Sequence, residues 1–159
     1  MPRITTNLWF DGNAVQAAEF YTSVFSNSRI TSTMPRNEAV PGDADGSPVT
    51  VDFVLDGQRF TGINGGPGFP FTEAMSLLIE CADQAEIDYY WEALLAGGGE
   101  PGRCGWLKDR FGVSWQVVSP RLAALLGDPD QERARRAFEA MYPMSKIELA
   151  VIEAAVASS

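Results

Sequence analysis

The chain has 159 residues, 45% of them hydrophobic, and a formal net charge of −9 at pH 7. This length suits one domain, or two small similar halves in one compact body. The acidic balance argues against nucleic-acid binding, which needs basic patches, and permits a cationic ligand. The sequence has no apolar run of about 18 residues that would cross a membrane, and no signal-peptide core at its N-terminus. We therefore expect a cytoplasmic protein without a nucleic-acid or membrane partner.

The histidine and cysteine counts limit the kinds of catalytic and metal site that the chain can form. The chain has no histidine, which removes Ser-His-Asp and Cys-His catalysis and the usual ligand of zinc, copper and iron sites. Its two cysteines, Cys81 and Cys104, are too few for a disulfide framework or an all-thiolate metal site, and we expect both to be reduced. No clustered Asp/Glu loop for magnesium or calcium stands out. We expect no metal and no cofactor.

The chain opens with a predicted strand and helix. Residues 4–10 have the composition of a strand and end at the turn signal Asp11-Gly12. Asn13 is placed to cap the helix that follows, with Gln16 three residues on as its capping-box partner. Apolar residues then recur at helical spacing, which gives this helix one buried stripe.

Three predicted strands complete this half. The first covers residues 29–34, and the loop over 35–48, rich in Pro, Gly, Asp and Asn, is either a lid or a plain surface loop. Residues 49–55 and 58–64 flank Asp56-Gly57, and two extended runs around an Asp-Gly pair predict a β-hairpin. The glycine-rich break that follows lacks the Lys-Ser/Thr ending of a phosphate loop. We expect a linker whose aromatic residues lean into a pocket.

The second half repeats this order. Residues 74–82 are typical of a buried strand, with polar Ser76 inside it. Asp83 is placed to cap the next helix, and Glu86 completes a capping box. A short strand near residues 100–103 then leads into a second hairpin.

That hairpin covers residues 104–119, with the turn at Asp109-Arg110-Phe111-Gly112. After the turn the side chains alternate between two faces, with Val113, Trp115 and Val117 on one and Ser114, Gln116 and Val118 on the other. Gln116 is a polar exception in an apolar strand, so it is a ligand contact or a satisfied member of a polar network. We expect this strand to line a cleft. Lys108 and Asp109 resemble a surface turn pair of little energetic weight.

The order strand, helix, three strands therefore occurs twice, over about 1–72 and 74–119. The predicted fold class is α+β, with paired βαβββ modules in one domain over 1–119 and a cleft between their concave sheet faces. Residues 120–159 form a helical C-terminal extension. Its helices are predicted to start at Ser119-Pro120, at Asp128-Pro129 and at Ser145 with Glu148. The last helix is too apolar to stay in water, so the extension packs on the body or on a second subunit.

A set of residues across the chain carries a resemblance to a known superfamily. They include Leu8-Trp9-Phe10-Asp11-Gly12, Ala18-Glu19-Phe20-Tyr21, Asn64-Gly65-Gly66, Gly105-Trp106-Leu107-Lys108-Asp109 and Phe111-Gly112-Val113-Ser114-Trp115-Gln116. The chain resembles the vicinal oxygen chelate (glyoxalase/bleomycin-resistance) superfamily, and within it the PhnB-like group often labelled 3-demethylubiquinone-9 3-methyltransferase. The resemblance covers about the whole chain. It implies paired βαβββ modules, usually assembled as a dimer whose clefts each hold a ligand.

Metal-dependent members of this superfamily carry His and Glu ligands on four strands. Transferred by position, those sites fall near Thr6, at Gly62 or Asn64, at Ser76 and at Gln116. None of these is a charged or imidazole ligand, and amide and hydroxyl oxygens bind transition metals poorly. The resemblance therefore implies a neutral hydrogen-bonding set that faces the cleft.

We predict no metal site, and a cleft that binds a small molecule. The candidate contacts are Thr6, Leu8, Phe10, Asn64, Phe69, Ser76, Cys104, Trp106 and Gln116. Several have a structural alternative: Ser76 with Gln116 as a satisfied polar pair, Asn64 as a turn residue, and Trp106 as a core or interface aromatic.

The predicted function is binding of a small aromatic or amphipathic molecule, without a metal, by a homodimer. The alternative is an enzyme: a methyltransferase, as the group's label says, or a metal-independent lyase or isomerase. A third possibility is an interaction protein whose cleft is filled by its own side chains.

Overall fold

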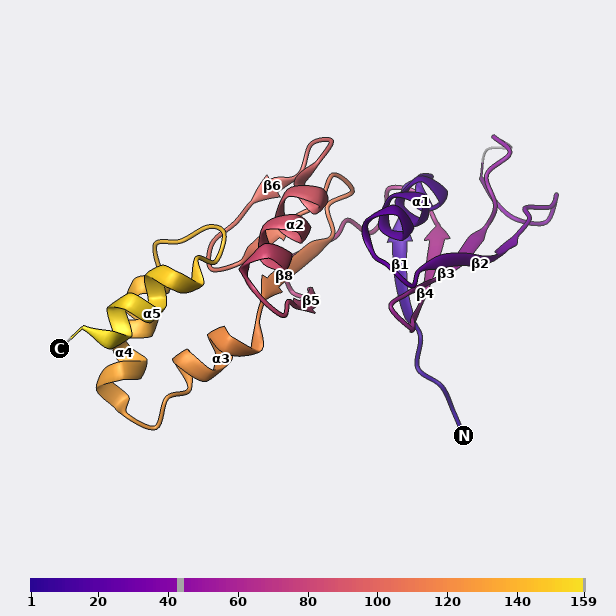
Figure 1. The fold of residues 1–159 in the computed structure, drawn as a ribbon. Helices are drawn as coiled ribbons and strands as arrows, with labels where there is room; N and C mark the ends of the chain where they lie inside the picture. The colour runs from indigo at the N-terminus through magenta and orange to yellow at the C-terminus, as the bar shows by residue number, and fades with distance from the viewer. Residues whose placement is uncertain (43–44, 159) are drawn as a thin grey trace. The chain divides into compact units, whose positions relative to one another are not determined.

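The computed structural model describes residues 1–42 and 45–158. The chain divides into two compact units, Met1–Phe71 and Thr72–Ser159. Each unit holds one four-stranded sheet and follows the order strand, helix, three strands, and the second unit adds three helices (Figure 1). The predicted α+β class and the repeated βαβββ order are confirmed.

The first unit has strand order β1-β4-β3-β2, with β1 parallel to β4 and the other neighbours antiparallel. Its elements are β1 (Thr6–Phe10), α1 (Ala14–Val24), β2 (Arg29–Met34), β3 (Thr50–Leu55) and β4 (Gln58–Asn64). The predicted hairpin around Asp56-Gly57 is confirmed, because these two residues connect β3 to β4 with φ of 45° and 83°. Two consecutive positive φ values are what a tight type I′ turn requires.

Helix α1 covers one face of this sheet, packing on β3 and β4. Tyr21 of the helix lies 6.1 Å from Phe53, and Phe53 stacks on Phe60 at 5.3 Å between ring centroids. Gly62 permits the close approach of helix and sheet, because a Cβ there would lie 3.1 Å from the Cβ of Ala14. This face is the core of the first unit.

The start of α1 corrects one prediction. Asn13 is the N-cap residue, but its side chain makes no capping hydrogen bond, so the predicted box with Gln16 is wrong. Asn64, fifty residues away, takes that role: its Oδ1 accepts from the Ala14 amide at 2.9 Å. Its Nδ2 donates to the Pro48 carbonyl, also at 2.9 Å. One buried amide therefore joins the helix start, the end of β4 and the loop before β3.

The second unit has the equivalent strand order β5-β8-β7-β6, again with one parallel pair, β5 and β8. Its elements are β5 (Leu77–Glu80), α2 (Gln84–Leu95), β6 (Glu100–Pro101), β7 (Trp106–Lys108), β8 (Ser114–Val118), α3 (Pro120–Leu126), α4 (Gln131–Met141) and α5 (Leu149–Ala157). The strand predicted over 74–82 is shorter, because residues before Leu77 do not pair with β8.

The capping box predicted for α2 is confirmed with one difference. Asp83 accepts from the Glu86 amide at 3.0 Å. Glu86 in return accepts from the amide of Ala82, at 2.8 Å, one residue before the expected Asp83. Asp83 thus satisfies a donor that the first helical turn leaves free, and Glu86 satisfies the amide just before the helix.

The turn between β7 and β8 corrects another prediction. Asp109 is not a surface residue but is 3% exposed. Its Oδ1 accepts from the amides of Phe111 and Val113, at 2.8 and 3.1 Å. Its Oδ2 accepts from the Trp115 indole nitrogen at 2.8 Å. A carboxylate with three donors shapes the turn and fixes the Trp115 ring, since hydrogen bonds to a charged acceptor are stronger than neutral ones.

Two of the three predicted helix starts in the C-terminal extension move along the chain. Ser119 caps α3 as predicted, accepting from the Leu122 amide at 3.2 Å. Asp130 rather than Asp128 caps α4. Glu148 occupies the N-cap position of α5 without a side-chain capping hydrogen bond. Ser145, predicted to open α5, instead donates to the Gly102 carbonyl.

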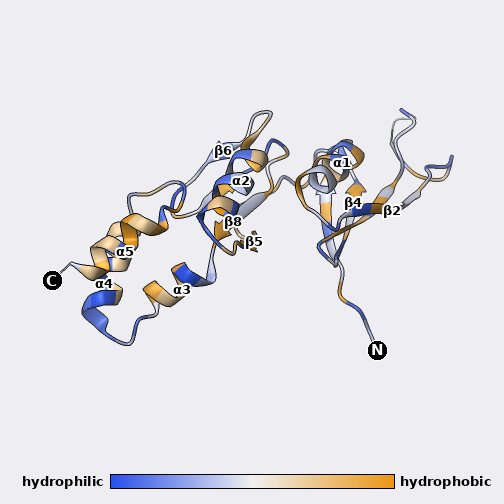
Figure 2. Cartoon of the chain, in the orientation of Figure 1, coloured by the Kyte–Doolittle hydropathy of each residue, from blue (hydrophilic) through white to orange (hydrophobic). Residues whose placement is uncertain are grey.

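The extension contacts the rest of the second unit through its backbone and its apolar residues. The Cys104 and Gly105 amides donate to the carbonyls of Met144 and Ser145, at 2.9 and 2.8 Å. Gln84 donates to the Ile147 carbonyl and accepts from the Leu149 amide. Figure 2 shows α5 as hydrophobic along its length and the start of α4 as hydrophilic. The buried apolar residues of the extension are Leu122, Leu125, Ala137, Met141, Ile147, Leu149, Ile152 and Val156.

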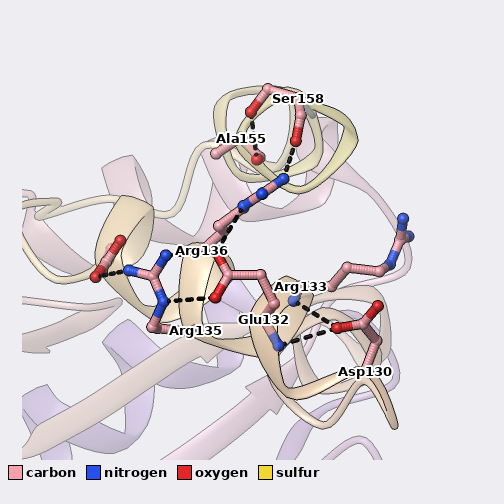
Figure 3. Close-up of polar contacts among 8 residues, drawn as sticks. Asp130, Glu132, Arg133, Arg135, Arg136, Ala155 and Ser158 are labelled. Carbon is pink, nitrogen blue, oxygen red and sulfur yellow. Dashed lines mark hydrogen bonds and ion pairs between the residues drawn. The ribbon is translucent and has the colours of Figure 1, made fainter.

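The polar side of α4 carries a network of ion pairs (Figure 3). Glu132 accepts from Arg135 at 2.5 Å and from Arg136 at 3.2 Å. Arg136 also donates to the Ser158 carbonyl just beyond α5.

In the part of the chain that the structure describes, no helix combines the length and apolarity needed to cross a bilayer.

Candidate functional site

Three of the candidates in the first unit lie on the sheet face that α1 covers. Leu8, Phe10 and Asn64 are 6%, 2% and 8% exposed. Thr6, half-buried at the start of β1, pairs with Phe60, which belongs to the same covered face. The first three are core residues of this unit, and Asn64 is occupied by its two backbone partners. The role of all four as ligand contacts stays a prediction, and we leave them out of the site proposed below.

The fifth candidate of this unit, Phe69, lies with an aromatic that the prediction did not include. Phe69 is 67% exposed and packs edge-on against Trp9, with 4.9 Å between ring centroids. The Trp9 indole donates to the Gly66 carbonyl at 2.9 Å. Gly65 must be glycine here, because a Cβ would lie 2.0 Å from the indole ring. Trp9 alternates with Leu8 and Phe10 along β1, so it points to the face opposite α1.

The second unit brings three candidates together on the sheet face that α2 does not cover. Helix α2 packs on β7 and β8, and the covered face carries the buried residues Leu107, Trp115 and Val117. On the opposite face Trp106 and Gln116 are paired residues of β7 and β8. Gln116 Nε2 donates to Ser76 Oγ at 2.9 Å. Among the described residues this is the only partner of either side chain, so the Gln116 carbonyl oxygen and the Ser76 hydroxyl proton are available to a ligand.

A pocket of about 200 Å³ adjoins Trp106. It is lined by Glu73, Glu100, Pro101, Gly102, Trp106, Leu107, Lys108 and Ser114. Ser114 is 2% exposed, and within residues 1–42 and 45–158 its hydroxyl has no hydrogen-bond partner. Buried polar groups are nearly always paired, so an orphaned hydroxyl at a pocket wall calls for an explanation. The prediction missed Ser114, although it had placed that residue on the same face as Gln116.

Two charged groups of this pocket, Lys108 and Glu73, are paired with each other. Lys108 Nζ lies 2.6 Å from Glu73 Oε1, so its partner is Glu73 rather than its neighbour in the turn. The hydrogen bond to Glu73, with a smaller contribution from the Glu100 carboxylate, raises the pKa of Lys108. The same hydrogen bond lowers the pKa of Glu73. Both groups are charged at neutral pH, which makes Lys108 unsuited to act as a general base there.

The two thiols are free, and neither is among the residues that line this pocket. Cys104 Sγ lies 3.8 and 3.7 Å from the carbonyl oxygens of Met141 and Tyr142, beside the C-terminal extension. Burial, aided by the charges of Glu86 and Asp83, raises the pKa of Cys81 to about 12. A thiol with this pKa is protonated at neutral pH and is not a nucleophile. Within the described residues, no three Cys, Asp or Glu side chains are grouped so as to hold a metal ion.

Two sheets with the same strand order, each built by a βαβββ unit with one helix on one face, define a protein of the vicinal oxygen chelate superfamily, with the glyoxalase/bleomycin-resistance fold. The family profile for 3-demethylubiquinone-9 3-methyltransferase matches residues 2–118. The chain belongs to this family. The matched region ends before α3, so the helical extension lies outside it.

Solved structures agree with this assignment. A PhnB protein from Bacillus cereus has 37% sequence identity, covers 74% of this chain and 99% of its own, and superposes with a TM-score of 0.67. Two more distant structures share the fold. Protein PA1353 from Pseudomonas aeruginosa has 21% identity, coverage of 75% and 98%, and a TM-score of 0.63. The fosfomycin resistance protein FosX from Listeria monocytogenes, in complex with Mn(II) and sulfate, has 13% identity, coverage of 74% and 89%, and a TM-score of 0.50. No curated protein matches the chain.

Proposed function

We propose that this chain binds a small aromatic or amphipathic molecule on the uncovered face of the second sheet, without a metal ion. One observation carries the proposal: the buried Ser114 hydroxyl has no partner among the described residues and lines a pocket beside Trp106. Leaving such a group unpaired costs about 1–3 kcal/mol. A ligand that hydrogen-bonds to Ser114 would remove this cost.

The size of the pocket defines how a ligand would use it. Pockets for drug-sized molecules are about 300–1,000 Å³, whereas this one is about 200 Å³. It therefore suits one end of a ligand, while an aromatic portion would stack on Trp106 and reach the polar pair of Ser76 and Gln116. Its wall carries two carboxylates, Glu73 and Glu100, and one cation, Lys108, and this negative balance together with the net charge of −9 favours a cationic ligand.

The alternative function is catalysis, which the family's description as a methyltransferase favours. Methyl transfer would need a methyl donor such as S-adenosylmethionine on one of the two sheets. A metal-independent lyase or isomerase would need a titratable group poised near neutral pH. The raised pKa of Lys108 and the lowered pKa of Glu73 do not provide one, which is why we place binding first.

We also propose that the protein acts as a homodimer in the cytoplasm. Support comes from large apolar side chains exposed in the second unit, such as Leu78 at 51% and Tyr142 at 67%. A second copy of the chain would remove such side chains from water. Light scattering coupled to size-exclusion chromatography measures the mass directly, and a monomer at micromolar concentration would contradict the dimer.

The proposal is tested by a thermal-shift screen of the purified chain. The panel holds divalent metals, S-adenosylmethionine, and small cationic or neutral aromatic compounds. A ligand present at about 100 times its dissociation constant adds roughly 2.7 kcal/mol, and each kcal/mol raises Tm by about 2–4 °C in a chain of this size. We expect a rise of several degrees with one or more aromatic cations.

Variants then assign the site. Gln116→Leu and Ser114→Ala should each reduce the ligand-induced shift, while Gln131→Leu, an exposed position on α4, should not. An unchanged shift in the first two variants would remove the site from the second sheet. A shift with a metal alone would overturn metal-free binding, and one with S-adenosylmethionine alone would establish the enzyme alternative. No shift with any compound would favour a vestigial site.

A further inference from the structure

Two arginines stand at one end of the first sheet, on the face opposite α1. Arg29 pairs with Val54 across β2 and β3, and Val54 pairs with Arg59 across β3 and β4. Residues directly opposite each other on neighbouring strands point to the same face. Val54 alternates with Phe53 and Leu55, which are buried towards α1, so this face is the uncovered one. Strands lie about 4.8 Å apart, which places the two arginine backbones roughly 10 Å apart.

Neither guanidinium group is neutralised within the described part of the chain. The side chains of Arg29 and Arg59 have no ion-pair or hydrogen-bond partner among residues 1–42 and 45–158. Other arginines of this acidic chain do pair: Arg121 with Glu153 at 2.7 Å and Arg133 with Asp128 at 3.0 Å. Within the described residues, the two guanidinium groups therefore place unpaired positive charge on one sheet face of a chain whose net charge is −9.

One carboxylate on this face is bonded to other side chains of the sheet. Asp52 lies two residues before Val54 on β3, so it points to the same side. Its two oxygens accept from the hydroxyls of Ser32 and Thr61, at 2.8 and 2.6 Å. The positive charge at the end of the sheet is thus left to solvent or to a ligand.

A pocket of about 370 Å³ lies at the arginines. It is lined by Asn27, Arg29, Thr31, Val54, Gly57 and Arg59. Among the described residues, the lining offers two guanidinium groups, a hydroxyl and a side-chain amide, and no carboxylate. Guanidinium groups bind carboxylate and phosphate oxygens in pairs of parallel hydrogen bonds, so such a lining favours an oxyanion.

We propose that this pocket binds the phosphate or carboxylate group of a small molecule between Arg29 and Arg59. The anion would relieve the repulsion between the two cations and receive hydrogen bonds from both. The site lies entirely in the first unit and does not depend on the binding face proposed for the second.

The test is an NMR titration of the ¹⁵N-labelled full-length chain with inorganic phosphate and, separately, with succinate. Sodium chloride is lowered in step so that the ionic strength stays constant. A change in charge screening then cannot cause the shifts. We expect saturable shifts centred on the amides of Asn27, Thr31 and Gly57. Saturation by phosphate alone assigns a phosphate group, by succinate alone a carboxylate, and by both an oxyanion of either kind.

Variants test the two arginines. Arg29→Gln and Arg59→Gln should each weaken binding by about tenfold, because each removes charge-assisted hydrogen bonds. Arg103→Gln removes the same charge from an exposed position in the second unit and should leave the affinity unchanged. Both arginines are exposed, so we expect neither substitution to disturb the fold. Unchanged amide resonances away from the pocket in each variant's ¹⁵N spectrum check this. Shifts that do not saturate with either anion, or that survive both substitutions, would overturn the site.

Discussion

Asn64 and Asp109 are the two buried polar residues on which local structure most depends. Asn64 joins three segments of the first unit through its amide. Asp109 joins three donors of the β7–β8 turn through its carboxylate. In each case the side chain forms the hydrogen bonds that water can no longer form with buried backbone groups. Leaving those groups unpaired would lower the free energy of unfolding.

Asn64→Ala should lower the free energy of unfolding by about 1–3 kcal/mol, because it leaves the Ala14 amide without its acceptor at a buried helix start. Asn13→Ala should cost less than about 0.5 kcal/mol, because the Asn13 side chain makes no capping bond. Urea denaturation followed by circular dichroism measures both. A larger loss in Asn13→Ala than in Asn64→Ala would show that Asn13, and not Asn64, caps α1 in solution.

Among the elements, α4 depends most on exposed ion pairs. Its carboxylates and guanidinium groups pair along the helix, and Arg136 also reaches the Ser158 carbonyl (Figure 3). Arg133 pairs separately with Asp128. Exposed pairs contribute little individually at neutral pH. The contribution of these ion pairs to stability is better measured as a function of pH, because an ion pair is lost when its carboxylate is protonated.

The hydrogen bond from Arg135, with smaller contributions from the charges of Arg135 and Arg136, lowers the pKa of Glu132 from 4.5 to about 2. A lowered pKa in the folded state means that this contribution is fully present above pH 4.5 and is lost as pH falls towards 2. The Tm difference between the wild type and Glu132→Gln should therefore be positive at pH 6 and vanish near pH 2. A scan of Tm against pH for both proteins checks this, with Glu92→Gln on α2 as an exposed control. A difference that persists at pH 2 would contradict an ionic role for Glu132.

At the scale of the whole molecule, the C-terminal extension is part of the second unit although it lies outside the family match. Its apolar residues are as buried as those under the sheets, with Ile147 and Ile152 at 0% exposure. A Cβ on Gly105 would lie 3.1 Å from Ile147 Cγ1, so this side chain packs directly beside the segment that leads into β7. The second unit has only small, short strands, and the extension supplies much of its apolar core.

Ile147→Ala should lower the free energy of unfolding by about 2–5 kcal/mol, the range for large-to-small changes in a packed core. Val151→Ala, at a position 54% exposed on α5, should change it by less than about 0.5 kcal/mol. Thermal and urea unfolding, monitored by circular dichroism, compare the two. A small effect of Ile147→Ala would mean that the extension docks weakly and is dispensable for the second unit.

Local sequence signals determined most of the elements of this protein. The Asp56-Gly57 hairpin, the Asp83 and Glu86 box, the Ser119 cap and the alternation of β8 all follow from residues within a few positions of each other, where steric and hydrogen-bond preferences act without the rest of the chain. The residues that carry the family resemblance also lie in short segments, over 8–12, 18–21, 64–66, 105–109 and 111–116, so the fold class followed from local sequence as well.

Tertiary contact alone decided the roles that depend on distant partners. Asn64 caps a helix fifty residues away, the Ser114 hydroxyl has no partner among the described residues at its pocket wall, and Lys108 pairs with Glu73. Alternation along β1 separates its residues into two sets, but only the packing of α1 decides which set is covered; it covers Leu8 and Phe10 and leaves Trp9 on the other face. The arginine pair of the first sheet arises from strand register, which brings Arg29 and Arg59 to the same end across Val54. Register and packing are set by the sum of many contacts over the whole unit, which no short stretch of sequence contains.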